Sequence, residues 1–100
     1  MYVRNTHIDV EPEHLEGYLS LITQHALYAK EHEPGVDRFD VLQSLEDPNL
    51  IHTVEIYTNR KAWIRYANQP YTVEFMNCAY VKQSEASGGT NREPTDAEWQ

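Results

Sequence analysis

The chain has 100 residues, and 8 lysines and arginines face 16 aspartates and glutamates, so its formal charge at pH 7 is -8. This length predicts one domain, residues 1–100, with a small but sufficient core. An acidic surface repels phosphate backbones and anionic lipid, so we expect neither a nucleic acid nor a membrane as partner.

The first third of the chain predicts a strand followed by a long helix. Residues 2–10 show the mixed alternation of a strand. Pro12 suits the first turn of a helix, where its missing N–H has no partner to lose. We expect Gly35 to end the helix in a left-handed conformation. Apolar residues recur every three or four positions, in the main row Leu15, Leu19, Ile22, Ala26 and Ala29 and in a second row Tyr18, Leu21, His25 and Tyr28.

A hairpin and two short helices are predicted next. In the strand that follows Gly35, Phe39 and Val41 share one side, opposite Arg38, Asp40 and Leu42. The chain turns at residues 45–49, and a strand over residues 51–57 runs back with Ile51, Thr53, Glu55 and Tyr57 on one side. Polar residues on both sides indicate a sheet with one face under helices and the other against a partner subunit. Residues 59–68 predict a helix that Gln69-Pro70 interrupts before a further helical stretch through Tyr71, Phe75, Cys78, Ala79 and Lys82.

The end of the chain has the least regular pattern. Residues 83–93 are polar and contain Gly88-Gly89, which gives a fourth strand little support. The tail, residues 92–100, has a disordered composition except for Trp99, which needs a groove to dock into. The order strand, helix, strand, strand, helix, strand predicts an α+β fold, the ferredoxin-like split βαβ with an antiparallel sheet. Residues 1–83 then form the core, and residues 84–100 hold the weak strand and the tail.

The single cysteine, Cys78, has no partner for an intrachain disulfide. Residues 2–10 have the pattern of a strand, so we expect no leader, and no apolar run approaches ~20 residues. We therefore expect a soluble, cytoplasmic protein. Within its apolar helical stretch, Cys78 is expected to be a buried, inert thiol.

An ordered set of short motifs resembles the antibiotic biosynthesis monooxygenase family: Glu33-Pro34-Gly35, residues 38–43, Asp47-Pro48-Asn49, Glu55-Ile56-Tyr57 and Ala62-Trp63. Residues 38–43 are especially similar to the branch with the autoinducer-2 phosphate isomerase and small quinol monooxygenases. The ending, with Gly89, Asn91, Pro94, Asp96 and Trp99, resembles some bacterial members. The resemblance implies a homodimer of ferredoxin-like protomers, a dimeric α+β barrel, with a pocket between sheet and helices in each. It also implies oxidation of phenols or quinols by dioxygen without a cofactor, although some members isomerise sugar-like phosphates and others degrade haem.

This chain departs from the family at several polar positions. Where the family often has His-x-x-Thr-Pro-His, residues 66–71 begin and end with Tyr66 and Tyr71. A phenol with a pKa of ~10 is a poor base at neutral pH. Ala26 and Lys30 stand where an Asn and a Ser are frequent, and no histidine lies near Phe75-Met76 to serve as a haem ligand.

Several residues are candidates for the site, and most have a structural alternative. Tyr66 and Tyr71 are expected to line the pocket, and Trp63 either binds substrate there or belongs to the core. Glu55 either meets a basic partner, with Arg38 the expected one, or lines the pocket.

Two histidines are candidates for a catalytic base. If one face of the first strand lies beneath the helices, Asn5 orients a substrate hydroxyl and His7 accepts its proton; otherwise both meet the partner sheet or water. His25 reaches the same cavity from the first helix, unless it is a core residue. The remaining histidines (His14, His32 and His52) lack the spacing of metal ligands, so we expect no dedicated metal site.

The sequence predicts a cofactor-independent monooxygenase for a quinol or polycyclic phenol. His7 or His25 takes the phenolic proton while Tyr66, Tyr71 and Asn5 hold the ring. One alternative is an isomerase of a small phosphorylated carbonyl compound, which needs cations converging from Arg4, Lys30, Arg38 and Arg65. The other is a non-catalytic small-molecule-binding dimer, which a solidly packed space between sheet and helices would favour.

Overall fold

The computed structural model describes residues 1–90. It contains four strands, β1 (Tyr2–Val10), β2 (Val36–Gln43), β3 (Leu50–Tyr57) and β4 (Val81–Thr90). A 3-10 turn at Pro12–His14 leads into α1 (Leu15–His32), and α2 (Arg60–Ala67) and α3 (Pro70–Met76) follow β3. This confirms the predicted order of elements, including the fourth strand for which the pattern gave little support. The predicted docking of Trp99 lies outside the described residues.

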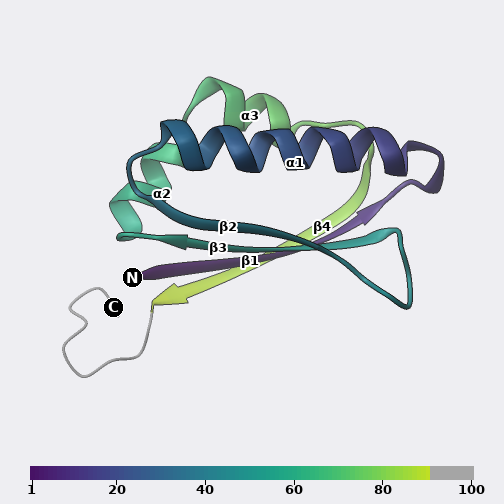
Figure 1. Cartoon of the computed structure of the whole chain (residues 1–100), viewed down its shortest axis with the longest axis horizontal. Coiled ribbons are helices and arrows are strands. Elements are labelled where there is room, and N and C mark those ends of the chain that lie inside the picture. Colours follow the sequence, from purple (N-terminus) through teal and green to yellow (C-terminus); the bar gives the residue numbers. More distant parts are fainter. Residues whose placement is uncertain (91–100) are drawn as a thin grey trace.

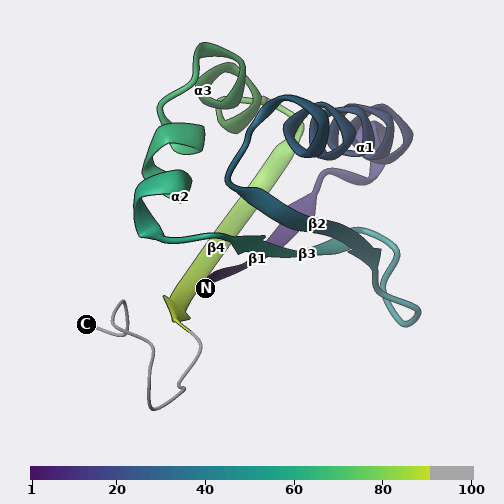
Figure 2. The same ribbon diagram turned by 60° about the vertical axis from the view of Figure 1, so that its left-hand side comes forward.

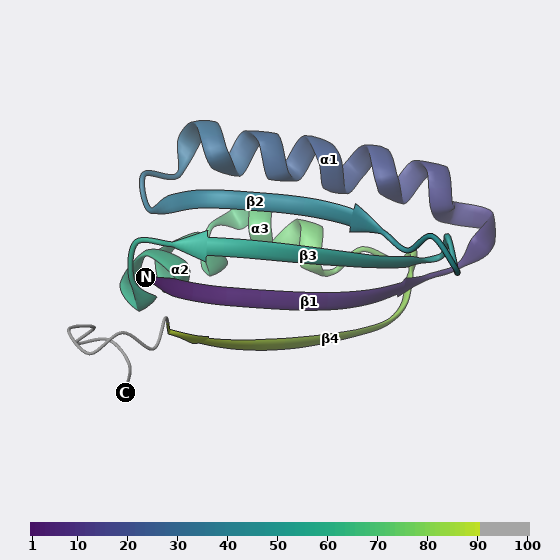
Figure 3. The same cartoon turned by 60° about the horizontal axis from the view of Figure 1, so that its bottom comes forward.

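The four strands form one open antiparallel sheet in the order β2-β3-β1-β4 (Figure 3). All three helices lie on the same side of this sheet (Figures 1 and 2). The architecture is the predicted ferredoxin-like α+β fold. Within residues 1–90, none of the helices has the length and apolar character needed to span a membrane.

Two local predictions were wrong. Gly35 does not adopt a positive φ; it is needed because a Cβ there would lie 2.1 Å from the Cβ of Ala62 in α2. The last helix ends at Met76, so Cys78 lies outside it and is only half-buried, and Lys82 belongs to β4. By contrast, α2 begins where expected, since the side chain of Asn59 caps it by accepting a hydrogen bond from the Ala62 amide at 2.8 Å.

The alternation of each strand decides which polar residues face the helices. On β3, Ile51, Thr53, Glu55 and Tyr57 are all buried on the helix side. On β1, Tyr2, Ile8 and Val10 are buried on that side, so Arg4 and Thr6 between them point the same way. The layer between sheet and helices is therefore not uniformly apolar.

Candidate functional site

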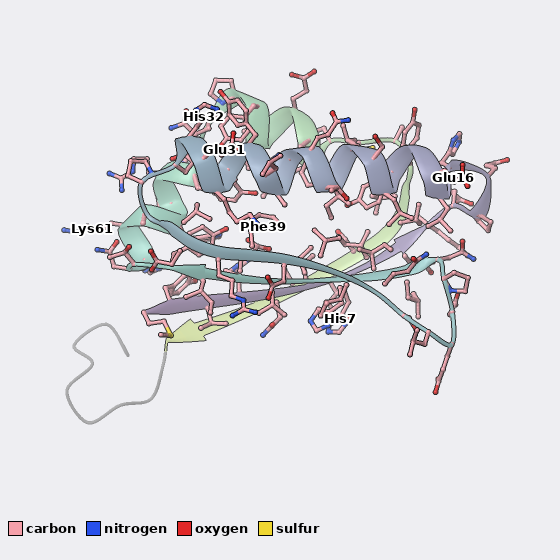
Figure 4. All side chains as sticks on the ribbon, viewed as in Figure 1. His7, Glu16, Glu31, His32, Phe39 and Lys61 are labelled. Carbon is pink, nitrogen blue, oxygen red and sulfur yellow. The ribbon has the colours of Figure 1, made fainter. Side chains whose placement is uncertain are left out.

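A cavity of about 260 Å³ lies between the sheet and the helices. Its polar side comes from the two central strands, through Arg4 and Thr6 of β1 and Thr53 and Glu55 of β3. Its apolar side comes from the helices and the flanking strands, with the aromatic residues Phe39, Trp63, Tyr66 and Phe75. Phe39 points from β2 toward α1 (Figure 4). We call this space the inner cavity.

Glu55 is the charged group most deeply placed in the inner cavity, with 7% of its surface exposed. The Thr53 hydroxyl donates to its Oε2 at 2.9 Å and the Tyr57 hydroxyl donates to its Oε1 at 2.5 Å. Burial raises the pKa of Glu55, against the opposing effect of these two hydrogen bonds and of the nearby Arg4. The carboxyl group is thus held in place and biased toward its protonated form.

The predicted pairing of Glu55 with Arg38 is wrong. Arg38 lies on the outer face of the sheet, where its Nε donates to Oδ2 of Asp40 at 2.6 Å. The cation near Glu55 is Arg4, whose guanidinium carbon lies 4.4 Å from the ring centroid of Trp63. The sequence did not identify Arg4, Thr6 and Thr53 as residues that line the inner cavity. The signal was there, because each lies two residues from a position on the same side of its strand as the buried apolar residues.

His25 and Tyr66 form a buried hydrogen-bonded pair, in which Tyr66 lines the inner cavity and His25 lines the outer groove described below. The Nε2 atom of His25 lies 2.5 Å from the Tyr66 hydroxyl oxygen, and the imidazole stacks on Phe75 with ring centroids 4.0 Å apart. Burial lowers the pKa of His25 to about 4. Burial, and then the Glu55 carboxylate, raise the pKa of Tyr66 above its ordinary value. At neutral pH the pair is therefore an uncharged imidazole bonded to an uncharged phenol.

Asn5 and His7 do not reach the inner cavity. They lie on the face of β1 away from the helices, where the exposed His7 points into open space (Figure 4) and stacks on His52 of β3 at 4.2 Å. Of the two orientations that the sequence left open, the structure has the one in which both residues face away from the helices. Neither predicted base lines the inner cavity itself, although His25 is hydrogen-bonded to Tyr66, which does.

Tyr71 faces a second hollow, which we call the outer groove. This groove has a volume of about 600 Å³ and lies between α1 and α3. Its walls include Leu21, Tyr28, Tyr71, Glu74, Phe75 and Tyr80. The Tyr71 hydroxyl donates to Oε1 of Glu33 at 3.1 Å. Trp63, in contrast, does line the inner cavity, where it is half-buried against Tyr2 with ring centroids 5.5 Å apart.

Cationic side chains do not converge on either hollow. Among the described residues, Arg4 is the one lysine or arginine that lines the inner cavity, and none lines the outer groove. Within residues 1–90, no three His, Cys, Asp or Glu side chains gather at metal-binding distance. The inner cavity thus has one acid, one cation, several aromatic rings and one phenol whose hydroxyl is hydrogen-bonded to a neutral imidazole.

Comparison with known proteins gives a consistent result. The sequence model of a family described as antibiotic biosynthesis monooxygenase matches residues 1–77. A candidate antibiotic biosynthesis monooxygenase from Bacteroides thetaiotaomicron is 25% identical, with a TM-score of 0.82 over 94% of this chain and 91% of that one. No curated protein matches the chain significantly.

Two further solved structures share the fold at lower identity. A candidate monooxygenase of the same kind from Nitrosomonas europaea is 22% identical, with a TM-score of 0.80 over 93% of this chain and all (100%) of that one. Another, from Deinococcus radiodurans, is 16% identical, with a TM-score of 0.87 over 96% and 97% of the two chains. At these identities the likeness shows the fold alone.

Proposed function

This chain belongs to the antibiotic biosynthesis monooxygenase family, and from that premise we propose that it oxidises a quinol with dioxygen in the inner cavity, with no bound cofactor. The observation that carries the proposal is the hydrogen bond between Tyr66, which lines the inner cavity, and His25. It gives the phenol at the cavity wall a neutral imidazole as proton acceptor.

The size and lining of the inner cavity favour a quinol of one or two rings over a larger polycyclic phenol. Its volume of about 260 Å³ lies just below the usual range for ligand pockets, about 300–1,000 Å³. The ring would lie among Phe39, Trp63 and Phe75, and its oxygens would meet the polar side formed by Arg4 and Glu55. Such a site holds a flat molecule and limits its contact with water.

The first step is loss of a proton from the quinol. The quinol hydroxyl gives its proton to the Tyr66 oxygen while Tyr66 passes its own proton to Nε2 of His25. This requires the imidazole tautomer whose Nε2 is unprotonated. Because burial disfavours the charged imidazole, the proton does not stay on His25. It passes on to water in the outer groove, which His25 lines.

The second step is electron transfer to dioxygen. The quinol anion gives an electron to dioxygen, and the two radicals combine at a ring carbon. The peroxide takes up one proton from water, which replaces the proton lost in the first step. Loss of the ring hydrogen together with cleavage of the O–O bond then leaves one oxygen atom on the ring and releases the other as water. Quinol and dioxygen thus yield a hydroxyquinone and water, and the quinol supplies all the electrons. The Arg4 guanidinium, at the cavity wall, would stabilise the anions formed on the way.

The two alternative functions have less support. An isomerase of a small phosphorylated carbonyl compound needs several cations at one place, whereas Arg4 is the one that lines the inner cavity among the described residues. A solidly packed interior would favour a non-catalytic binding protein, whereas this interior holds a cavity.

We also propose that the protein acts as a homodimer through the outer face of its sheet. Val3, Val54 and Ile56 lie on that face half-buried, and the exposed Leu42 adjoins them on β2. Light scattering of the purified protein tests this part of the proposal.

The decisive experiment measures whether an oxygen atom from dioxygen is incorporated into the product. Purified protein freed of metal and flavin is mixed with one- and two-ring hydroquinones and with an anthrone under heavy-isotope dioxygen. We expect one labelled oxygen atom in the product and oxygen uptake above the autoxidation rate. His25→Phe and Tyr66→Phe should both slow uptake, whereas Tyr28→Phe, outside the inner cavity, serves as the matched control. No uptake above autoxidation with any compound would refute the proposal.

A further inference from the structure

We propose that the outer groove is a second binding site, separate from the inner cavity, for a small organic cation that carries an aromatic ring. This inference goes beyond the proposed function and does not depend on it. Among the described residues, Phe75 is the one side chain that lines both hollows. A ligand in the groove therefore has its own set of contacts.

The groove is walled by the rings of five side chains, contributed by α1, by α3 and by the segment after α3: His25, Tyr28, Tyr71, Phe75 and Tyr80. Tyr28 meets Tyr71 edge-on with centroids 4.7 Å apart, and His25 stacks on Phe75. Aromatic faces carry partial negative charge, so several faces around one space attract a cation.

Gly17 helps to shape one end of the groove. A Cβ at Gly17 would lie 3.3 Å from the Tyr80 ring, which is a tight contact. The missing side chain therefore lets the Tyr80 ring lie close to α1. Tyr28 and Tyr80 remain 47% and 37% exposed, so their rings have surface left to offer a ligand.

The charge of the groove selects a cation over an anion. Glu74 is the one acidic residue in its lining, no described lysine or arginine lines it, and Glu74 forms no ion pair with a described residue. The imidazole of His25 is neutral at pH 7, and the whole chain has a charge of -8. An anionic ligand would meet repulsion here, whereas a cation gains from both Glu74 and the rings.

The size of the groove points to a free small molecule. About 600 Å³ lies within the range of pockets for drug-sized ligands, about 300–1,000 Å³. A single lysine-type side chain would leave most of the ring surface uncovered. An aryl group bearing an amine or a quaternary ammonium would use both the rings and the carboxylate.

Binding of benzyltrimethylammonium to the full chain at pH 7.5 tests the proposal. Benzyl alcohol serves as the neutral control and phenylacetate as the anionic control, with calorimetry for affinity and amide NMR shifts for location. We expect the cation to bind about tenfold more tightly than benzyl alcohol, and phenylacetate not to bind. The shifts should map to α1 and α3 around Tyr28 and Tyr71.

Two variants separate the groove from the overall charge of the protein. Glu74→Gln should weaken cation binding about three- to tenfold. Glu46→Gln removes the same charge from an exposed loop position and should leave the affinity unchanged. Tyr28→Leu, at an exposed position, should weaken binding without unfolding the protein.

Several outcomes would overturn the proposal. Equal affinity for the cation and benzyl alcohol would refute the selection by charge. Equal losses in the Glu74 and Glu46 variants would show attraction by net charge alone. Shifts confined to the inner cavity would place the ligand elsewhere, and tighter binding of a trimethyl-lysine peptide than of the aryl cation would identify a protein partner instead.

Discussion

Acid should destabilise this protein through His25 in particular. The imidazole is buried, with 7% of its surface exposed, and its pKa falls from 6.5 to about 4. In the unfolded chain the same group titrates at its ordinary pKa, so between these two values the unfolded state binds more protons. Stability is therefore complete above pH 6.5 and is lost as the pH falls toward 4.

The size of the effect follows from the difference in pKa. Each pKa unit corresponds to about 1.4 kcal/mol, so the free energy of unfolding should drop by about 2.5 kcal/mol between pH 7.5 and pH 4.5. His25→Phe keeps a ring of similar size but loses the hydrogen bond to Tyr66. That loss should cost about 1–2 kcal/mol at pH 7.5. The variant should then be the less stable protein at pH 7.5 and the more stable one at pH 4.5, with the order reversing between about pH 5 and pH 6.

Urea unfolding of the wild type and the variant across this pH range measures the difference between their free energies of unfolding. The titration of all other groups is common to both proteins and cancels from this difference to first approximation. The NMR signals of the His25 ring report its pKa directly. A stability difference that does not change with pH, or a ring that titrates between pH 6 and 7, would contradict both the burial argument and the neutral imidazole of the proposed mechanism.

Three further substitutions have distinct expected results. Gly35→Ala should destabilise the fold by about 2–3 kcal/mol in urea unfolding, because its Cβ would overlap that of Ala62, and the double variant with Ala62→Gly should recover part of the loss. Glu55→Gln should cost about 1–3 kcal/mol near neutral pH, since its amide cannot accept both hydrogen bonds. The wild type has a raised Glu55 pKa, so its stability should fall as the pH rises through that value, whereas the variant should lack this decline. Tyr66→Phe should lower quinol-dependent oxygen uptake about tenfold or more and leave cation binding in the outer groove unchanged.

The regular elements followed from local pattern because their causes are local. The apolar row from Leu15 to Ala29 and the start of α2 at Asn59 depend on neighbouring residues, and both helices begin close to where they were expected. β4 shows the opposite case, since its polar segment has no apolar alternation. It is a strand because its backbone pairs along the length of β1.

Which residues line the inner cavity depends on which face of the sheet each strand residue points to. A shift of one residue in the register of a strand exchanges the two faces. Asn5 and Arg38 are plausible pocket residues by type, yet both lie on the outer face of the sheet. Arg4 and Thr6 occupy the alternate positions and line the inner cavity instead. The pairing of β1 with β3 fixes which of these residues face the helices, and the sequence of β1 alone does not reveal that pairing.

By itself the sequence determined the order of the elements, the family and the set of polar and aromatic side chains available for chemistry, because each depends on residues close together in the chain. Only the tertiary structure decided that His25 meets Tyr66 across 41 positions, that Tyr71 faces a different hollow and that Gly35 must make room for Ala62. These contacts join segments far apart in the chain, so they depend on how the helices pack against the sheet and not on any local preference.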